Sequence, residues 1–444
     1  MSKGRRPTGR PSGARRTARS NWPGPDTVEV TVTALGARGD GLAQHESSAL
    51  FVVGALPGER VRARVGARKG HGWQAHVTDV LQASAERIEP ACPHFGPCGG
   101  CTIQHLSPSA QAAWKRQQVV EALIRRGFPA PEVDATVSVP PGQRRRCTVA
   151  WRRTPRGALV GFHAQDTHRL EDVRACAMLT PALFALMEPL RALVRDIARP
   201  GEHGQAVLTM TDTGAEVALI LARPPDLAAR ERLAAFAEAT DLARLRWMPD
   251  PDSAPEPLAE RRPPVVTLGE AAVVLPPLAF LQPSRAGGDA ITASVLARLP
   301  EGSGSVLDLF AGVGTLSFPL AGTGRPVHAV DAAPEALSAL AAAIPPHRQM
   351  TTACRDLERD PLQGADLTGH EVAVFDPPRA GARAQAAALA QHGPDRIIAV
   401  SCNPSSFARD ARALADGGYT LGRATPIDQF PWSAHVELVA GFSR

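Results

Sequence analysis

Apolar residues follow three successive patterns along the chain. From Thr27 to about Ala85, short β-branched runs such as TVEVTVTAL, ALFVVGAL and RVRARVGA alternate with glycine-rich turns. Short strands at this spacing predict a small β-barrel. The middle third mixes strand-like runs, among them CTVAWRR and EVALILA, with a helix predicted near 181–196, which indicates an α+β region. We interpret the PDPDSAPEPLAERRPP stretch at 249–264 as a surface loop.

The third pattern begins after Gly302, where short apolar strands alternate with alanine-rich helices (SVLDLF, TLSFPLAG, PVHAVD, PEALSALAAAI, EVAVFD and RIIAVS). This rhythm predicts an α/β fold with a Rossmann-like, doubly wound parallel sheet. A chain of 444 residues is long enough for two or three domains. The predicted boundaries are a disordered basic tail at 1–24, an OB-like barrel at 25–85, a central α+β domain at 86–270, and an α/β domain at 271–444 on which part of 102–128 packs.

Charge is concentrated at the start of the chain. The whole sequence carries 49 Lys and Arg against 44 Asp and Glu, but residues 1–20 alone hold seven basic residues and no acidic one. This segment is rich in Arg, Gly, Pro and Ser and cannot bury apolar surface, so we expect a disordered arm. A nucleic-acid partner is suggested by it, although cationic tails can also serve only to keep a protein in solution.

No apolar run approaches the roughly 18 residues that would span a bilayer, and no signal-peptide pattern follows the basic start. We therefore expect a cytoplasmic protein without a membrane partner. In that compartment the seven cysteines stay reduced, which favours metal binding or catalysis over disulfides. Cys147 and Cys354 are interpreted as small buried apolar residues.

A ligand pocket is predicted where strands of the α/β pattern end. VLDLFAGVGTLSFPLA places Asp308 at a strand end and Gly312 and Gly314 in the following turn, where backbone can approach a ligand closely. Asp331 ends the next strand and could accept hydrogen bonds from two ribose hydroxyls. A nicotinamide dinucleotide would also suit this arrangement, although the full G-x-G-x-x-G is missing because position 317 is Ser.

Two later strands end in residues suited to pyrimidine chemistry. Asp376 precedes two prolines, which hold the backbone rigid and can aim its carboxylate at a flat polar ring. Cys402 follows the strand RIIAVS and precedes Asn403 and Pro404, where a helix start could stabilise a thiolate. A thiolate that adds to carbon 6 of uracil makes carbon 5 nucleophilic enough to attack a sulfonium methyl group.

A base must then remove the hydrogen from carbon 5. The C-terminal stretch DQFPWSAHVELV supplies Glu437 on a strand-like segment, with His435 as a competing candidate. Two other functions stay open at this point: a cytosine-5 methyltransferase, which also uses a thiolate, and a non-catalytic RNA-binding protein with a decayed pocket.

Four further cysteines form a candidate metal site. Cys92, Cys98 and Cys101 in ACPHFGPCGGC are separated by short spacings, and Cys176 follows later in VRACAML. Four thiolates suit either zinc or an iron–sulfur cubane, and His94 could replace one of them. Spacing alone leaves these alternatives open.

With these residues in hand, the chain resembles the RNA uracil-5 methyltransferase family, and its 23S ribosomal RNA branch more than its transfer-RNA branch. The resemblance runs from about residue 27 to the C-terminus and includes the cysteine cluster, FLQPS, DLFAGVGTLSFPLA, FDPPRAG, VSCNPSSFARD and DQFPWSAHVE. It implies a class I methyltransferase domain, an N-terminal TRAM barrel that binds RNA, and a four-iron four-sulfur cluster on Cys92, Cys98, Cys101 and Cys176.

The resemblance also assigns roles to single residues. It implies Cys402 as nucleophile, Glu437 as the base, and Asp376 as a third catalytic residue. The residues that would line the S-adenosylmethionine site or its border with the uracil are Gln282, Phe310, Gly312, Gly314, Thr315, Asp331, Asp356 and Asp376. Three positions depart from the family pattern: Ser284 where Asn is common, Ala311 where Cys is common, and Trp432 where His or Tyr is frequent.

An arginine-rich strip adds a candidate RNA contact. GQRRRCTVAWRRTPRG concentrates Arg144, Arg145, Arg146, Arg152 and Arg153 around Trp151. The arginines could pair with phosphates, and Trp151 could stack on a splayed base. The partners expected from the sequence are therefore RNA, most specifically 23S ribosomal RNA, and no obligate protein, with a monomer as the expected state.

Overall fold

The structure is a computed structural model, and it describes residue 22, residues 24–165, residue 167 and residues 169–444. Almost all of the basic tail predicted at 1–24 lies outside these residues. The chain divides into two compact units, residues 1–85 and 86–444.

The first unit is a closed five-stranded barrel with the strand order β1-β2-β3-β5-β4. Its strands are β1 (Thr27–Leu35), β2 (Gly41–His45), β3 (Ser48–Val53), β4 (Arg60–Lys69) and β5 (Gly72–Gln82). Strict alternation on β1 buries Val28, Val30 and Val32 and exposes the residues between them, because successive side chains of a strand point to opposite faces. The predicted small barrel is confirmed.

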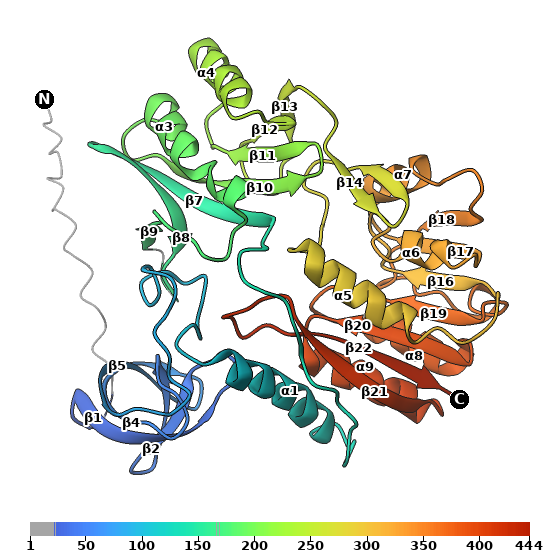
Figure 1. Cartoon of the computed structure of the whole chain (residues 1–444), viewed down its shortest axis with the longest axis horizontal. Coiled ribbons are helices and arrows are strands. Elements are labelled where there is room, and N and C mark those ends of the chain that lie inside the picture. The colour runs from blue at the N-terminus through green and yellow to red at the C-terminus, as the bar shows by residue number, and fades with distance from the viewer. Residues whose placement is uncertain (1–21, 23, 166, 168) are drawn as a thin grey trace, which may run out of the picture. The chain divides into compact units, whose positions relative to one another are not determined.

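The second unit contains two large sheets (Figure 1). The first has seven strands in the order β13-β12-β11-β10-β7-β8-β9, with helices α3 and α4 against one face. Its elements are β7 (Arg146–Thr154), β8 (Gly157–His163), β9 (Leu170–Asp172), α2 (Pro181–Phe184), α3 (Met187–Ile197), β10 (His203–Thr211), β11 (Gly214–Ile220), α4 (Leu227–Ala239), β12 (Arg244–Met248) and β13 (Glu256–Glu260). The stretch interpreted as a surface loop thus contributes the edge strand β13.

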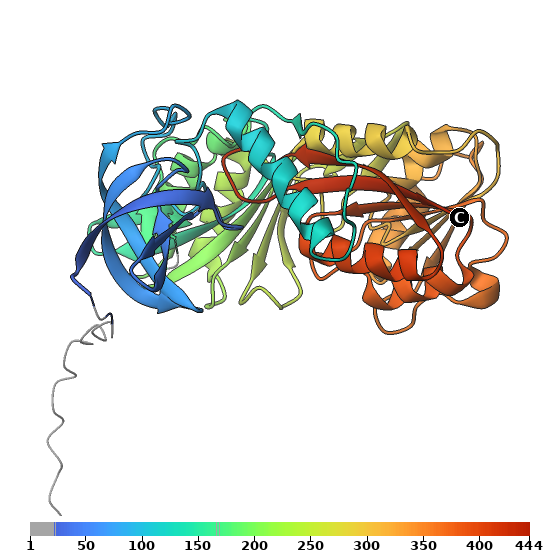
Figure 2. The same cartoon turned by 90° about the horizontal axis from the view of Figure 1, so that it is seen from below.

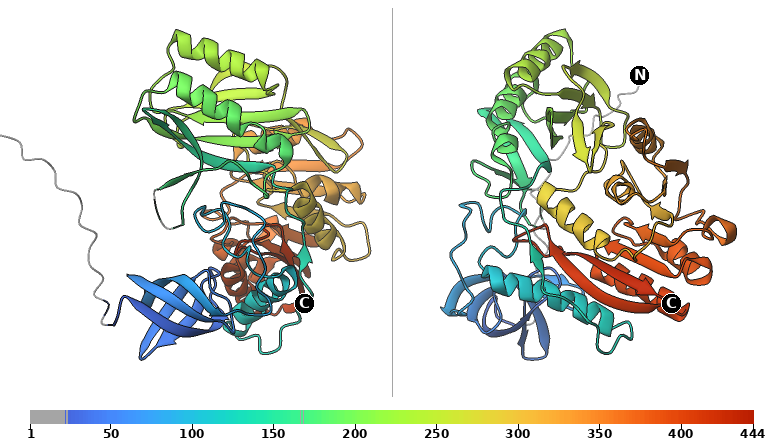
Figure 3. Two further views of the ribbon diagram at one scale, coloured as in Figure 1. Left: turned by 60° about the vertical axis from the view of Figure 1, so that its left-hand side comes forward. Right: turned by 45° about the vertical axis from the view of Figure 1, so that its right-hand side comes forward.

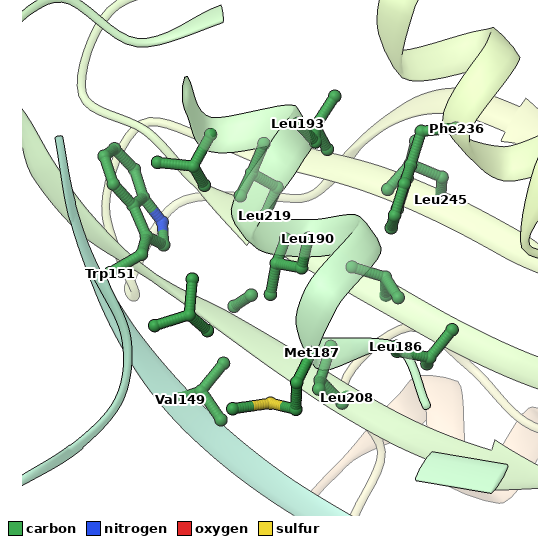
Figure 4. Packing of buried hydrophobic residues seen from close by; sticks show 14 of the residues in the cluster. Val149, Trp151, Leu186, Met187, Leu190, Leu193, Leu208, Leu219, Phe236 and Leu245 are labelled. Carbon is green, nitrogen blue, oxygen red and sulfur yellow. The ribbon is translucent and has the colours of Figure 1, made fainter. Parts of the chain in front are cut away.

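Trp151 lies in the core of this sheet, where it packs near Leu190 and Leu219 (Figure 4). It is 1 % exposed, and its indole nitrogen donates to the Gln205 carbonyl oxygen at 3.0 Å. The predicted stacking of Trp151 on an RNA base is therefore wrong, because alternation along β7 turns this side chain inward.

The second large sheet has eight strands in the order β18-β17-β16-β19-β20-β22-β21-β6. Its first five strands are parallel, and β22 runs antiparallel between β20 and β21. Its elements are β6 (Val137–Ser138), β16 (Val306–Leu309), α6 (Ser317–Gly322), β17 (Val327–Asp331), α7 (Pro334–Ala342), β18 (Met350–Cys354), a 3-10 turn (Gly364–Asp366), β19 (Val372–Phe375), α8 (Arg383–His392), β20 (Arg396–Ser401), α9 (Pro404–Asp416), β21 (Thr420–Asp428) and β22 (Glu437–Ser443).

Helices cover both faces of this sheet, as expected for a doubly wound fold (Figure 3). Side chains of α5 (Arg285–Leu296) and α6 pack with one set of inward-facing strand residues, and those of α8 and α9 pack with the other set. A hairpin of β14 (Val265–Leu268) and β15 (Ala271–Val274) packs beside α7.

Helix α1 (Pro108–Ile124) comes from the segment between the barrel and the central sheet but packs on α9 and β21 (Figure 2). Val119, Ala122 and Leu123 of α1 belong to the same buried cluster as Phe407 and Leu414 of α9. No helix within the described residues is long and apolar enough to cross a membrane.

Candidate active site

The carboxyl ends of five neighbouring parallel strands bring most of the predicted site residues to one edge of the sheet. Taken across the sheet, the residues at or just after these ends are Asp356 (β18), Asp331 (β17), Phe310, Gly312 and Thr315 (β16), Asp376 (β19) and Cys402 (β20). The strands that follow β16 in the chain lie on one side of it, and the strand that follows β19 lies on the other side. Open α/β sheets bind ligands at such a switch point in strand order.

The turn after β16 is shaped for a close ligand approach. Phe310 and Gly312 have φ angles of 63° and 55°, in the left-handed region. A Cβ added at Gly312 would meet no heavy atom within 4 Å, so open space lies beside this turn. The helix predicted from TLSFPLAG begins at Ser317, two residues later than the pattern suggested.

Asp331 holds this turn and keeps capacity for a ligand. Its carboxylate accepts the backbone N–H groups of Gly312 and Ala333, both at 2.8 Å. A carboxylate offers about four acceptor positions, so about two stay available for ribose hydroxyls. Asp356, in contrast, caps its own turn by accepting the N–H groups of Glu358 and Arg359.

Two carboxyl groups on this edge have raised pKa values. Burial raises the pKa of Asp308 to about 7, opposed by the Ser317 hydroxyl, which donates to it at 2.5 Å. Burial also raises the pKa of Asp376 to about 7. Carboxyl groups with such pKa values hold a proton for part of the time at neutral pH, which is typical of functional sites.

Cys402 lies between β20 and α9, as predicted. Asn403 is the N-cap of α9, its side chain accepts the Ser405 N–H at 3.1 Å, and Pro404 occupies the first turn. The Asn403 amide and the Ser406 hydroxyl also donate to the Arg379 carbonyl oxygen, each at 3.2 Å. These bonds tie the turn that carries Cys402 to the turn that carries Asp376.

The charges of Glu437 and Asp376 act on Cys402, and the charge of Asp376 acts on Glu437, so the three side chains lie close together. Burial raises the pKa of Cys402 to about 11, and the charges of Glu437 and Asp376 raise it further than the nearby Arg379 lowers it. The expectation that its neighbours stabilise the thiolate is therefore not met in the protein alone. Burial and Asp376 likewise raise the pKa of Glu437 to about 8. His435 is exposed, whereas Glu437 is 5 % exposed.

Gln429 was not among the predicted site residues, and it joins Glu437 to Gln282. Its amide nitrogen donates to Glu437 Oε1 at 3.0 Å and to Gln282 Oε1 at 2.9 Å. Gln429 is 3 % exposed. It stands next to Asp428 in the DQF stretch, so a polar residue at the buried end of a strand was the signal that could have identified it.

The segment after Cys101 supports the loop between β21 and β22. The N–H groups of Thr102 and Ile103 donate to the Trp432 carbonyl oxygen at 2.8 and 3.1 Å. The Trp432 N–H donates to Gln111 Oε1 of α1 at 3.2 Å. Lys115 of α1 donates to Asp428 Oδ1 at 2.5 Å and to the Phe430 carbonyl oxygen at 2.9 Å.

The three residues that depart from the family pattern fit the local structure around them. Ser284 caps α5, with its hydroxyl accepting the Gly287 N–H at 3.0 Å, which is a task that Asn also performs. Trp432 adopts a φ of 63°, and its backbone is bound on both sides by the contacts just described. Ala311 is buried beside the glycine turn.

The four clustered cysteines come within electrostatic reach of one another. Burial raises the pKa of Cys101 to about 12, and the charges of Cys176, Cys98 and Cys92 contribute to that rise. Within the described part of the chain, no group of three or more His, Cys, Asp or Glu residues is arranged to hold a single metal ion.

His94 is engaged elsewhere and does not join the four thiols. Its Nδ1 lies 3.2 Å from Glu171 Oε1, and its Nε2 accepts the Arg174 N–H at 3.0 Å. Both ring nitrogens are therefore used, and they fasten the Cys92–Cys101 loop to the segment that leads to Cys176. The alternative of His94 as a metal ligand is not supported.

Most of the predicted arginine strip serves the fold. Arg144, Arg145, Arg146 and Arg153 donate to backbone carbonyl oxygens, and only Arg152 of the five is exposed. Cys147 is buried as predicted, whereas Cys354 is exposed, because it ends the edge strand β18.

Comparisons with known proteins agree with this geometry. The family model for tRNA (uracil-5-)-methyltransferases matches residues 277–442, and the model for the TRAM domain matches residues 26–69. A crystal structure of the Pyrococcus abyssi tRNA (uracil-54, C5)-methyltransferase in complex with S-adenosyl-L-homocysteine covers 93 % of this chain, and this chain covers 99 % of that one, with a TM-score of 0.74 at 22 % identity. This likeness shows the class I methyltransferase fold.

Relatives of known family match the chain over almost its whole length. An RNA methyltransferase of Caulobacter vibrioides is 38 % identical over 94 % of this chain and 100 % of its own length. The 23S rRNA (uracil(1939)-C(5))-methyltransferase of Halomonas elongata is 35 % identical over 92 % of this chain and 88 % of its own. The chain therefore belongs to the RNA (uracil-5-)-methyltransferase family.

Proposed function

We propose that this enzyme transfers the methyl group of S-adenosylmethionine to carbon 5 of a uridine in RNA, with Cys402 as the nucleophile. The observation that carries the proposal is the convergence of Cys402, Glu437 and Asp376 at the carboxyl edge of the sheet, beside the turn of Gly312, where the charges of Glu437 and Asp376 act on the Cys402 thiol. These groups come from three separate strand ends, so their convergence needs a reason beyond the stability of the fold.

The first step is addition of the Cys402 thiolate to carbon 6 of the uracil. A carbon–sulfur bond forms, and the electron pair of the 5,6 double bond moves through carbon 4 onto oxygen 4 as an enolate. We assign Asp376 to this oxygen, because a carboxyl group with a pKa of about 7 can hold a proton and donate a hydrogen bond as negative charge develops.

S-adenosylmethionine would supply the methyl cation equivalent that carbon 5 captures, leaving a neutral thioether. Asp331 and the open space beside Gly312 fit its ribose and adenosyl parts. Glu437 then removes the proton from carbon 5, the electron pair restores the 5,6 double bond, and Cys402 leaves as a thiolate. Glu437 suits this role better than His435 because its charge acts directly on Cys402.

The test is a single-turnover methyl transfer assay with radiolabelled cofactor. Cys402→Ala should abolish transfer, and Glu437→Gln should accumulate a covalent protein–RNA adduct that shifts on a denaturing gel. His435→Gln is the matched control and should turn over without such a shift. Label on cytosine, or activity in Cys402→Ala, would contradict the proposal.

We propose 23S ribosomal RNA as the substrate class, with transfer RNA as the alternative. The support is the Halomonas elongata relative, which is 35 % identical over most of both chains. Unmodified 23S rRNA and transfer-RNA transcripts offered in competition would decide, because label on transfer RNA alone would exclude the first. The monomeric state and the cytoplasmic location stay predictions of the sequence.

We also propose an iron–sulfur cluster on Cys92, Cys98, Cys101 and Cys176. Four thiolates around one zinc ion lie about 3.8 Å apart, as follows from tetrahedral bonds of about 2.3 Å. A cubane binds each thiolate at a different iron, so its ligands stand further apart. The support for the cubane is the resemblance of these four cysteines to the set that holds a four-iron four-sulfur cluster in the 23S ribosomal RNA branch, and the charges of neighbouring thiols act on Cys98 and Cys101. The cluster would hold this loop together, since methyl transfer moves no net electrons.

A further inference from the structure

Gln429 bears a buried oxygen with no hydrogen-bond partner among the described residues. Both acceptors near its amide, Glu437 Oε1 and Gln282 Oε1, lie within hydrogen-bond distance of the same nitrogen. When Glu437 is charged, as the proposed base must be, a flipped amide would place its oxygen against the carboxylate, so in that state the network fixes which atom is the nitrogen. An unsatisfied buried carbonyl oxygen is destabilising, and this arrangement therefore calls for a functional reason.

Gly287, in the first turn of α5, provides the room for this side chain. A Cβ added at Gly287 would lie 2.5 Å from both Cβ and Oε1 of Gln429, whereas one added at the neighbouring Gly288 would meet Gln282 Cβ at 3.5 Å, an ordinary contact. No positive φ is recorded at either glycine, so the backbone does not require glycine at either position. Alanine favours a helix over glycine, so Gly287 is explained by the space that it leaves for Gln429 and for the Ser284 hydroxyl, from which an added Cβ would be 2.7 Å away.

The bonds of Gln429 form a chain of fixed polarity. A charged Glu437 can only accept, so Gln429 must donate to it, and the second N–H of Gln429 then donates to Gln282 Oε1. This bond fixes the amide of Gln282, whose own nitrogen has no partner in the described part of the chain and can donate to a ligand. The backbone of Gln282 is held as well, since Arg145 Nε donates to its carbonyl oxygen at 3.1 Å.

We propose that Gln429 is a positioning residue for the methyl transfer. Its side chain occupies the space beside Gly287, where it orients Glu437 and fixes Gln282. The proposal rests on the proposed function, in which Glu437 is the base. A hydrogen bond donated to the carboxylate stabilises its charged form, and so Gln429 both orients the base and opposes the rise of its pKa.

The test follows the decay of the covalent adduct as a function of pH. Gln429→Met keeps the volume but removes both N–H donors. It should form the Cys402–RNA adduct as fast as the wild type and resolve it about tenfold more slowly at pH 7, which corresponds to one unit of pKa in Glu437. The deficit should shrink to about twofold at pH 9, where Glu437 is largely charged in the wild type and about half charged in the variant, and should vanish at higher pH.

Gly287→Ala should reproduce this behaviour by displacing Gln429, and Gly288→Ala on the same turn is the matched control that should resolve the adduct like the wild type. Binding of S-adenosylhomocysteine, measured by calorimetry, reports on the integrity of the pocket. Loss of that binding together with a lowered free energy of unfolding in Gln429→Met would overturn the assignment, because the residue would then be needed for the fold.

Glu437→Gln, run in parallel, separates the two proposals. If no adduct accumulates in Glu437→Gln, the proposed function fails. If it accumulates there, but Gln429→Met and Gly287→Ala resolve their adducts at the wild-type rate at every pH, Gln429 is only a packing residue and the present inference is wrong.

Discussion

Lys115 and Asp428 form a buried ion pair that joins helix α1 to the end of strand β21. The Lys115 Nζ lies 2.5 Å from Asp428 Oδ1, and the two side chains are 0 % and 5 % exposed. Lys115 also donates to the Phe430 carbonyl oxygen, and Asp428 Oδ1 accepts the Phe430 N–H at 3.0 Å. The loop that leads from Asp428 to Glu437 is thus held by a residue more than 300 positions earlier in the chain.

Removing Lys115 should destabilise the protein and impair the base. Lys115→Met leaves the buried Asp428 carboxylate without a positively charged partner. Such a change typically lowers the free energy of unfolding by about 3–5 kcal/mol. We expect that loss in urea unfolding at pH 7 and a smaller one at pH 5, because burial already raises the pKa of Asp428 and a protonated Asp428 needs no cation. Lys115→Met combined with Asp428→Asn should recover part of the stability.

Arg125→Met is the matched control for this prediction. Arg125 is the C-cap residue of α1. Its guanidinium lies 3.5 Å from the Glu121 carboxylate, and both side chains of this ion pair are exposed. Exposed pairs contribute about 0–1 kcal/mol, so this variant should unfold near the wild-type urea concentration. Equal losses in Lys115→Met and Arg125→Met would contradict the role given to the buried pair.

The α/β pattern after Gly302 predicted the sheet well because its strands are buried on both faces and therefore apolar throughout. Val372–Phe375 is an example, and it is followed by Asp376, which reaches the site. Cys402 and Glu437 were found for the same reason. Strand ends are local features, and the order of the strands in the sheet brings them together.

Contacts between distant segments could not be read from the pattern. Lys115 and Gln111 lie on a helix whose apolar and polar residues are not clearly separated onto two faces. Nothing in the local sequence shows that these two side chains contact Asp428 and Trp432. Trp151 was misread for a related reason, since arginines on both sides of it suggested an exposed strand while its own position faces the core. Gln429 needed the positions of both Gln282 and Glu437 to be recognised.

The reactivity of Cys402 should depend on the charge of the bound cofactor. Burial and two carboxyl groups raise the pKa of this thiol to about 11, so little thiolate is present at neutral pH. Its alkylation by iodoacetamide should therefore accelerate steeply from pH 7 to 10. S-adenosylmethionine carries a positive sulfonium and should speed the alkylation, provided that it leaves the thiol accessible, whereas the neutral S-adenosylhomocysteine should not.

Mass spectrometry of the modified peptide is the measurement, and the exposed Cys354 serves as an internal control in the same sample. Cys354 should react at a rate that neither cofactor changes. An identical effect of both cofactors on Cys402 would show that they act by shielding the thiol and not by their charge.

The cysteine cluster should lose its metal when any one of its four thiols is replaced. Cys92→Ser or Cys176→Ser should lower the iron and sulfide content of anaerobically purified protein and remove its brown colour. Cys354→Ser is the control, since this exposed thiol lies outside the cluster. Zinc in place of iron in the wild-type protein would contradict the assignment.

A damaged cluster should also disturb the base. Thr102 and Ile103 follow Cys101 directly and bind the Trp432 carbonyl oxygen, so disorder in the cysteine loop would release the loop that leads to Glu437. Hydrogen exchange of residues 429–436 should therefore rise in Cys92→Ser and stay unchanged in Cys354→Ser. Protection that survives loss of the metal would show that α1 alone is sufficient to hold this loop.

Replacing Asp308 should stabilise the protein without ligand at high pH only. Its pKa is raised from 3.8 to about 7 in the folded state, so the folded protein binds more protons than the unfolded one between these values, and stability falls as the pH rises through this interval. A shift of about 3 units corresponds to about 4 kcal/mol at most above pH 7. Asp308→Asn is nearly isosteric and removes that term. In urea unfolding, the variant should therefore be more stable than the wild type by about 2–4 kcal/mol at pH 8. It should have no advantage at pH 4, where position 308 is uncharged in both folded proteins. A variant that is less stable than the wild type at pH 8 would show that the bond from Ser317 outweighs the burial of charge.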